Sequence, residues 1–194
     1  MKITNIAIFA SGSGSNAEII ANYFNFSAQV KVGCFLSNNP DAPVLQRAKR
    51  LKIPAFTFNQ SEIGINGKVH EILIDAEIDF IILAGYMKLI PEWLVFRYKD
   101  RLINIHPALL PKFGGKGMYG LRVHEAVIAA GEKETGITIH LVNSEYDKGK
   151  ILFQAKCPVE PNDTPELLAQ RVHQLEHKYY AKTIEEYILK NTCR

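Results

Sequence analysis

Three polar side chains in the second half of the chain have the chemistry that acyl transfer needs. Asn104 and His106 stand two residues apart in "NIHP", directly after an apolar run. Residues two apart in an extended chain point to the same side. The amide can donate a hydrogen bond to a developing oxyanion, and the imidazole can carry a proton. Asp147, in "EYDKGK", is the preferred candidate for a carboxylate that orients the imidazole, and Glu145 is its competitor.

No side chain stands in the setting that a covalent acyl-enzyme requires. No serine or cysteine occurs in a nucleophile-elbow pattern, and the metal-binding spacings H-E-x-x-H and H-x-x-E-H are absent. The stretch "HQLEH" (173–177) places two histidines four apart, but its glutamate is not where the zincin pattern has it. We therefore predict no metal site, and direct transfer to a bound amine.

A loop of small residues near the N-terminus, "SGSGSN" (11–16), has the composition of an anion-binding turn. It formally fits the dinucleotide fingerprint G-x-G-x-x-A, but the second predicted strand ends in "LSNN" and lacks the acidic residue that would hold a ribose. Small residues let backbone N–H groups approach a phosphate, and the following helix offers its positive end. We expect a phosphate monoester here, with a ligand-free turn as the alternative. The expected phosphate-binding residues are Ser13, Gly14, Ser15 and Asn16.

Apolar runs alternate with helical patterns along most of the chain, which indicates a parallel sheet covered on both faces. The predicted strands span 5–10, 30–37, 53–58, 79–85 and 101–106. Helices are expected from Ala17, over 44–52 and over 68–78. Strands at 135–142 and 151–159 read as a hairpin, and a last helix over 165–190 has Asp163 or Thr164 as its cap. The predicted class is α/β: a Rossmann-like, mostly parallel sheet with helices on both faces, and an antiparallel hairpin and a long helix at the C-terminal end.

The predicted topology brings the polar stretches together. Ligands of open parallel sheets bind outside the carboxyl ends of the strands. "SGSGSN", "AGYMKLIP" and "NIHP" each follow a predicted strand, so we expect them along one edge. His106 stands at that edge, whereas the other five histidines fall in predicted helices or inside a strand and are interpreted as structural.

Composition narrows the class of protein. The 194 residues are 47% hydrophobic and 22% charged, with a net charge of +3 and no dense block of lysine and arginine, so nucleic acid is not expected as a partner. No apolar stretch is long enough for a membrane span. Three scattered cysteines without a signal peptide favour the reducing cytoplasm. We expect one domain, 1–194, with a phosphate-binding half (1–100) and a catalytic half (101–194).

Five stretches, taken in order, resemble the folate-dependent glycinamide ribonucleotide formyltransferases of purine biosynthesis. They are "SGSGSN", "LAGYMKLIP", "NIHPALLPKF", "HLVNSEYDKGKIL" and "LEH", and they run nearly end to end. The resemblance implies a transferase that moves a formyl group from 10-formyltetrahydrofolate, its co-substrate, to the amino group of 5-phosphoribosylglycinamide. It implies small-molecule partners and a monomer or homodimer.

The resemblance also assigns residues. Asn104 would hold the formyl oxygen, His106 would shuttle protons, and Asp147 would raise the pKa of the histidine. Pro107 and Glu176 would contact the ribonucleotide, although Glu176 alone reads as a solvated helix residue. The residues expected to hold the folate are Met87, Lys88, Leu89, Ile90, Asn104, Asn143, Ser144, Glu145 and Tyr146.

The chain departs from this family in two stretches. Relatives often carry an arginine before the helix preceding "DFIILAG", whereas this chain has only Lys68 there, so that contact is not transferred. "GGKGMYGLRVHEA" carries extra residues, and 116–120 is expected to be a flap or a pterin contact.

Three rival functions are weighed. Hydrolysis of 10-formyltetrahydrofolate could use the same three side chains, although such deformylases usually carry an extra N-terminal domain. Methionyl-tRNA formyltransferase shares the folate chemistry, but its tRNA-binding C-terminal domain has no counterpart before Arg194. A non-catalytic nucleotide-binding sensor is the rival from another class. Asn104, His106 and Asp147 count against it, because a sensor needs neither an oxyanion donor nor a proton carrier.

Overall fold

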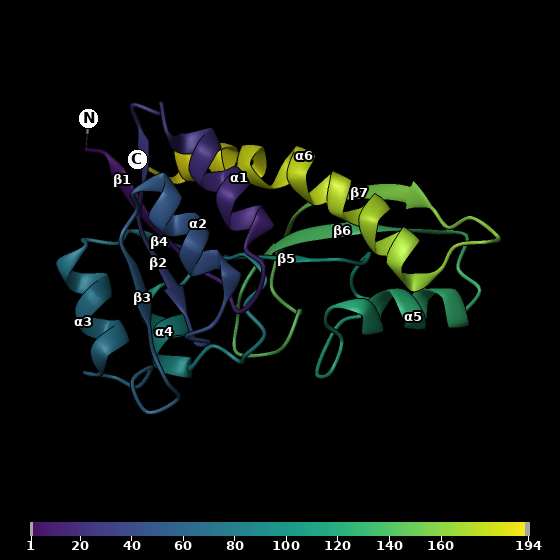
Figure 1. Cartoon of the computed structure of the whole chain (residues 1–194), viewed down its shortest axis with the longest axis horizontal. Helices are drawn as coiled ribbons and strands as arrows, with labels where there is room; N and C mark the ends of the chain where they lie inside the picture. The colour runs from purple at the N-terminus through teal and green to yellow at the C-terminus, as the bar shows by residue number, and fades with distance from the viewer. Residues whose placement is uncertain (1, 193–194) are drawn as a thin grey trace.

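The computed structural model describes residues 2–192, in which seven strands form one sheet (Figure 1). The strands are β1 (Thr4–Phe9), β2 (Val30–Ser37), β3 (Ala55–Thr57), β4 (Phe80–Leu83), β5 (Leu102–His106), β6 (Glu134–Leu141) and β7 (Ile151–Pro158). Their order across the sheet is β3-β2-β1-β4-β5-β6-β7. The first five are mutually parallel, and β6 and β7 add antiparallel pairs at one side. The predicted mixed sheet with a terminal hairpin is therefore confirmed.

Helices cover both faces of the sheet, as the apolar strands predicted. The helices are α1 (Ser15–Phe24), α2 (Pro43–Leu51), α3 (Lys68–Asp75), α4 (Glu92–Arg97), α5 (Leu121–Ala129) and α6 (Pro165–Thr192). Helices α1, α2 and α6 pack on one face, and α3 and α4 on the other (Figure 1). Strand β1 shows why: Ile6 and Ile8 belong to the first core, whereas Ala7 and Phe9 belong to the second. Both sides of a central parallel strand are buried, so alternation disappears from its sequence.

Local sequence explains where the elements begin and end. Thr164 rather than Asp163 caps α6, since its Oγ1 accepts a hydrogen bond from the Leu167 N–H at 3.3 Å. Pro43 opens α2, where its missing N–H costs nothing. Helix α4 was not predicted, because its six residues are too few to show a helical period. Strand β4 ends at Leu83, two residues before the predicted end.

The side chain of Tyr180 links helix α6 to the sheet beside Asn104. The buried hydroxyl of Tyr180 lies 2.9 Å from the carbonyl oxygen of Leu83 and 3.2 Å from that of Ile103. Leu83 is the last residue of β4, and Ile103 precedes Asn104 in β5. None of the helices in residues 2–192 combines the length and the hydropathy that crossing a bilayer demands.

Candidate active site

The loops that follow the strands enclose a cavity of about 830 Å³, a size typical of small-molecule sites. Its walls come from the glycine loop after β1, the segments after β4 and β5, the β6–β7 loop and the facing sides of α5 and α6. The carboxyl edge of the sheet therefore carries the cavity, as the topology predicted.

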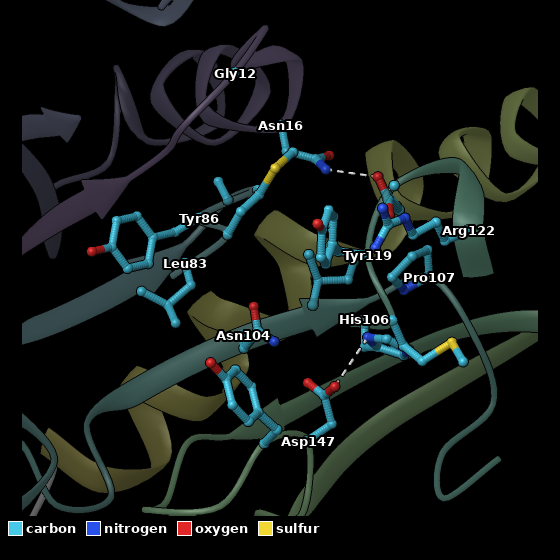
Figure 2. A pocket seen from close by; sticks show the side chains of 18 of the residues that line it. Gly12, Asn16, Leu83, Tyr86, Asn104, His106, Pro107, Tyr119, Arg122 and Asp147 are labelled. Carbon is cyan, nitrogen blue, oxygen red and sulfur yellow. Dashed lines mark hydrogen bonds and ion pairs between the residues drawn. The ribbon is translucent and has the colours of Figure 1, made fainter. Parts of the chain in front are cut away.

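His106 lies at the floor of this cavity and is 3% exposed. Its Nε2 donates to the carbonyl oxygen of Phe113 at 2.7 Å, and its Nδ1 lies 3.5 Å from Oδ2 of Asp147 (Figure 2). Burial lowers the pKa of His106, while Asp147 and the Phe113 carbonyl act in the opposite direction and favour the charged ring. The expected effect of Asp147 on the pKa is present, but burial outweighs it. Nδ1 is the ring atom that is left to exchange a proton.

His140 lies beside Asn104 and Asp147, two members of the expected catalytic set. Its Nδ1 donates to the carbonyl oxygen of Leu141 at 2.8 Å, so Nε2 of the neutral ring is an acceptor. That Nε2 lies 3.1 Å from Nδ2 of Asn104 and 3.6 Å from Oδ1 of Asp147. One N–H of the Asn104 amide is thereby fixed on His140, and the second stays available for a ligand oxygen. His140 was interpreted as structural from its place inside a strand, so its position beside Asn104 was missed.

Asp147 is a partly buried carboxylate that faces two imidazoles and a backbone N–H. Burial raises the pKa of Asp147, but His140, His106 and the N–H of Gly115 outweigh it and hold the pKa below its usual value. The N–H of Gly115 lies 2.9 Å from Oδ2. Asp147 is therefore ionised at neutral pH and faces both imidazoles. Glu145, the competing candidate, instead pairs with Lys148 at 2.5 Å.

The glycine loop is built for close approach to a ligand. Gly14 has a φ of 73°, and a Cβ there would lie 2.3 Å from Val44, so only glycine fits. It directly precedes α1, whose first residues, Ser15 and Asn16, line the cavity. The amide oxygen Oδ1 of Asn16 is buried without a hydrogen-bond partner. Buried polar atoms are nearly always paired in proteins, which marks this atom as a ligand contact.

A short chain of hydrogen bonds ties this loop to α6. Nδ2 of Asn16 donates to Oε2 of Glu176 at 2.7 Å, and Nδ1 of His173 donates to the same oxygen at 2.7 Å. Nε2 of His173 lies 2.8 Å from Oγ of Ser15. The hydrogen bond to Glu176 raises the pKa of His173. Glu176 is 8% exposed, so its interpretation as a solvated helix residue was wrong.

The structure brings nearly all the expected site residues to one cavity. Of the residues expected to bind either substrate or to act in catalysis, Ser144 alone does not line it. Lys68 is also remote, since its Nζ donates to the carbonyl oxygen of Thr57 at 2.7 Å. The cavity additionally takes in Tyr86, His124, His140, His173 and the stretch 115–122, none of which was expected to bind either substrate except 116–120 as an open possibility. Within residues 2–192, no group of three or more His, Cys, Asp or Glu side chains is arranged to hold a metal ion.

The fold and the site together define an α/β protein in which a glycine-rich loop and a buried histidine open on the same cavity. The family described as formyl transferase matches residues 4–184. The chain belongs to this family.

Named relatives agree with this assignment. The chain is 42% identical over 185 residues to a chloroplastic phosphoribosylglycinamide formyltransferase of Arabidopsis thaliana, covering 92% of this chain and 63% of that protein. It is 36% identical over 189 residues to the Bacillus subtilis phosphoribosylglycinamide formyltransferase, covering 94% and 93%. The crystal structure of the Bacillus halodurans phosphoribosylglycinamide formyltransferase superposes with a TM-score of 0.86 at 35% identity, covering 98% and 97%. The chain thus spans less than two thirds of the plant relative but nearly all of the bacterial ones.

Proposed function

We propose that the protein transfers the formyl group of 10-formyltetrahydrofolate to the amino group of 5-phosphoribosylglycinamide, as a one-carbon transferase of purine biosynthesis. One observation carries the proposal: Asn104, His106 and Asp147 open on the same cavity as the glycine loop. The names of the relatives support it. We further propose that the formyltransferase unit extends over 1–194, with phosphate binding mainly in 1–100 and catalysis in 101–194. Buried free Cys34 and Cys157 favour a cytoplasmic setting.

The ribonucleotide is proposed to bind between the glycine loop and α6. Backbone N–H groups at 13–16 and the N-terminus of α1 suit its phosphate. The unpaired Oδ1 of Asn16 is an acceptor for a ligand hydroxyl or amine. Glu176 is fixed by Asn16 and His173, and its charge suits the protonated or hydroxyl-bearing part of the substrate. Pro107 continues this wall after β5.

The folate is proposed to bind at the other end of the cavity. Met87, Leu89 and Ile90 supply an apolar wall, and Asn143 and Tyr146 line the facing loop, with Lys88 and Glu145 also on the lining. Flat heteroaromatic rings bind in such clefts through apolar walls and a few polar groups that fix orientation. Ser144 is retained only as a backbone element of that loop, since its side chain is not on the lining. The residues therefore suit this co-substrate, and they leave the catalytic set between the two ligands.

The proposed chemistry uses the second N–H of Asn104 and Nδ1 of His106, which the hydrogen bonds to His140 and Phe113 leave available. The amine attacks the formyl carbon, and the carbonyl oxygen gains negative charge. The free N–H of Asn104 donates to that oxygen, an interaction of a kind that contributes roughly 10²–10³ in rate. The bond from the formyl carbon to the folate nitrogen then breaks. The proton lost by the amine passes through Nδ1 of His106 and ends on the leaving nitrogen, and a positioned acid–base group contributes roughly 10²–10⁴.

Asp147 completes this proposal as the group that stabilises the charged imidazole. His106 is buried, so its protonation would be costly without a nearby carboxylate. Oδ2 of Asp147 lies 3.5 Å from Nδ1, close enough to stabilise the imidazolium that forms during transfer. The carboxylate itself stays ionised because His140 and Gly115 lower its pKa.

The test separates transfer from hydrolysis. The protein is incubated with 10-formyltetrahydrofolate, with and without 5-phosphoribosylglycinamide, and loss of the formyl group is followed by absorbance. Release that depends strictly on the ribonucleotide, with formylated ribonucleotide as product, supports the proposal. Equal rates without it would indicate a hydrolase, and binding without turnover would indicate a sensor.

A further inference from the structure

We infer that Arg122, held against the ring of Tyr119, contacts the phosphate of the ribonucleotide from the α5 side of the cavity. The inference rests on the proposed function and adds a specificity-determining residue to it. It gives a role to the end of the stretch in which this chain differs from the family that its sequence resembles.

The position of Arg122 on the cavity lining suits contact with a ligand. Arg122 lies in the first turn of α5 and lines the cavity. Its guanidinium carbon is 5.2 Å from the centre of the Tyr119 ring, a stacking distance that restricts its rotamers. No carboxylate of residues 2–192 lies within ion-pair distance of it. A preorganised guanidinium fork without a partner is the group that binds phosphate in a bidentate manner.

The glycine loop does not have a free cation of its own. Arg47 is the arginine bound to it, and its Nε donates to the carbonyl oxygen of Ser13 at 2.7 Å. Arg47 pairs with Glu18, which also pairs with Arg50 at 3.0 Å. Neither arginine lines the cavity. The loop therefore offers N–H groups and neutral side chains to a phosphate that carries nearly two negative charges at neutral pH.

A carboxylate beside the glycine loop increases the need for positive charge near a bound phosphate. The carboxylate of Glu176 is 2.7 Å from the Asn16 amide, so a phosphate in this loop has an anion close by. Repulsion between two anions in a partly buried site is costly unless a cation lies nearby. His173 offsets the charge of Glu176 in part, but it is hydrogen-bonded to that carboxylate and to Ser15. Lys88, Lys116 and Arg122 are the lysine and arginine side chains on the cavity lining, and of the three only Arg122 has a planar fork that can hold a phosphate in a bidentate manner.

The position of α5 brings Arg122 to this end of the cavity. Figure 2 shows Tyr119 and Arg122 on the side of Asn16, whereas Asn104 and Asp147 lie lower in the same view. His124, two residues further along α5, is close enough to Glu176 for that charge to act on it. His124 is 4% exposed and lines the cavity, and its Nδ1 has no hydrogen-bond partner. A buried unpartnered ring nitrogen is a second, independent sign that a polar ligand completes this end of the site.

The test is calorimetric binding of two ligand pairs that differ only in the phosphate. The pairs are ribose 5-phosphate with ribose, and 5-phosphoribosylglycinamide with its dephosphorylated nucleoside. The variants are Arg122→Ala and Arg122→Lys. Arg101→Ala is the matched control, because Arg101 also stacks on a tyrosine, with its guanidinium carbon 5.4 Å from the Tyr98 ring centre, but does not line the cavity.

We expect Arg122→Ala to raise the Kd of both phosphorylated ligands about tenfold or more, as loss of a charge-assisted bidentate contact does. Arg122→Lys is expected to lose part of that affinity, since it retains the charge but not the fork. Arg101→Ala and the unphosphorylated ligands are expected to change less than about twofold. Circular dichroism of each variant confirms that it is folded.

Unchanged affinity of Arg122→Ala for the phosphorylated ligands, or an equal loss for phosphorylated and unphosphorylated ones, would overturn the inference. Absence of phosphate-dependent binding in the unaltered protein would overturn it as well. Ribose 5-phosphate binding that depends on Arg122, in a protein that transfers no formyl group, would uphold the inference while the proposed function fails. Normal transfer with no effect of Arg122→Ala would leave the function intact and remove the inference alone.

Discussion

The backbone N–H of Gly115 donates a hydrogen bond to Oδ2 of Asp147 at 2.9 Å, across 32 residues of sequence. The two glycines that follow "LLPKF" thus hold the carboxylate that faces His106. Asp147 has a φ of 55°, in the left-handed region that aspartate tolerates better than most residues. Its side chain is positioned both by this backbone conformation and by a separate loop.

Gly114→Ala is expected to displace Asp147 and slow the reaction. An added Cβ would lie 2.4 Å from Cδ2 of Leu110 and 3.2 Å from Cβ of Asp147, so the loop must shift away from the carboxylate. We expect kcat to fall at least about tenfold, because misplacement of a catalytic group by 1 Å is expensive. Steady-state kinetics measure this. Gly64→Ala is the control, since a Cβ there meets only a carbonyl oxygen at 3.7 Å, and kcat should not change.

His106→Ala is expected to remove turnover and leave binding of the ribonucleotide nearly normal. In the proposed mechanism His106 exchanges a proton with the reacting atoms and does not hold the phosphate, so kcat should fall roughly 10²–10⁴-fold while the Kd changes little. Rapid-quench kinetics and calorimetry measure the two quantities. A large loss of ribonucleotide affinity would contradict the proton-carrying role and indicate a binding role.

His173→Gln is expected to change the pH dependence of stability. Glu176 raises the pKa of His173 above that of the unfolded chain, so the charged ring stabilises the folded state fully below about pH 6.5. That contribution is lost as the pH rises through the raised pKa. The free energy of unfolding in urea should therefore differ between variant and parent more at pH 6 than at pH 9. A difference that does not vary with pH would show that the pair is not charged in the folded protein.

Tyr180→Phe is expected to destabilise the fold by about 1–3 kcal/mol, the cost of leaving buried carbonyl groups without a donor. The lost hydroxyl lies 2.9 and 3.2 Å from two carbonyl oxygens. Tyr187→Phe is the matched control, because its hydroxyl donates to the carbonyl oxygen of Asp100 at 2.9 Å in an exposed setting. Urea denaturation should separate the two variants clearly. Equal and small losses would mean that water reaches the carbonyls freed at Leu83 and Ile103.

Periodicity and strand topology were enough to predict the sheet and the edge that carries the cavity. Apolar runs identify β4 and most of β1 and β5, because strands buried on both faces carry few polar side chains. The same rule places Asn104 and His106 beside the glycine loop, since residues that follow parallel strands meet at one edge. The roles of these residues stay predictions. Short elements such as α4 carry too few residues for a period, and they were missed.

The sequence could not show which histidines touch the site. His140 lies within a strand and His173 within a helix, and nothing local distinguishes them from core or surface residues. Their contacts with Asn104 and Ser15 depend on strand pairing and on the docking of α6, which join residues 36 and 158 positions apart. The burial of Glu176 has the same origin. These contacts and this burial depend on long-range packing, which a short window of sequence does not reveal.

Helix α6 presents Glu176 to the glycine loop and Tyr180 to β4 and β5, and the two residues lie four apart on one face of the helix. This arrangement constrains which substitutions α6 can accept. A substitution that tilts or shifts α6 to improve its packing on the sheet also moves the Glu176 carboxylate beside the glycine loop. Changes in thermal stability and in substrate affinity are therefore expected to be coupled. The stretch 116–122 lines the cavity, and none of its residues belongs to either hydrophobic core. New specificity is therefore expected to arise there first.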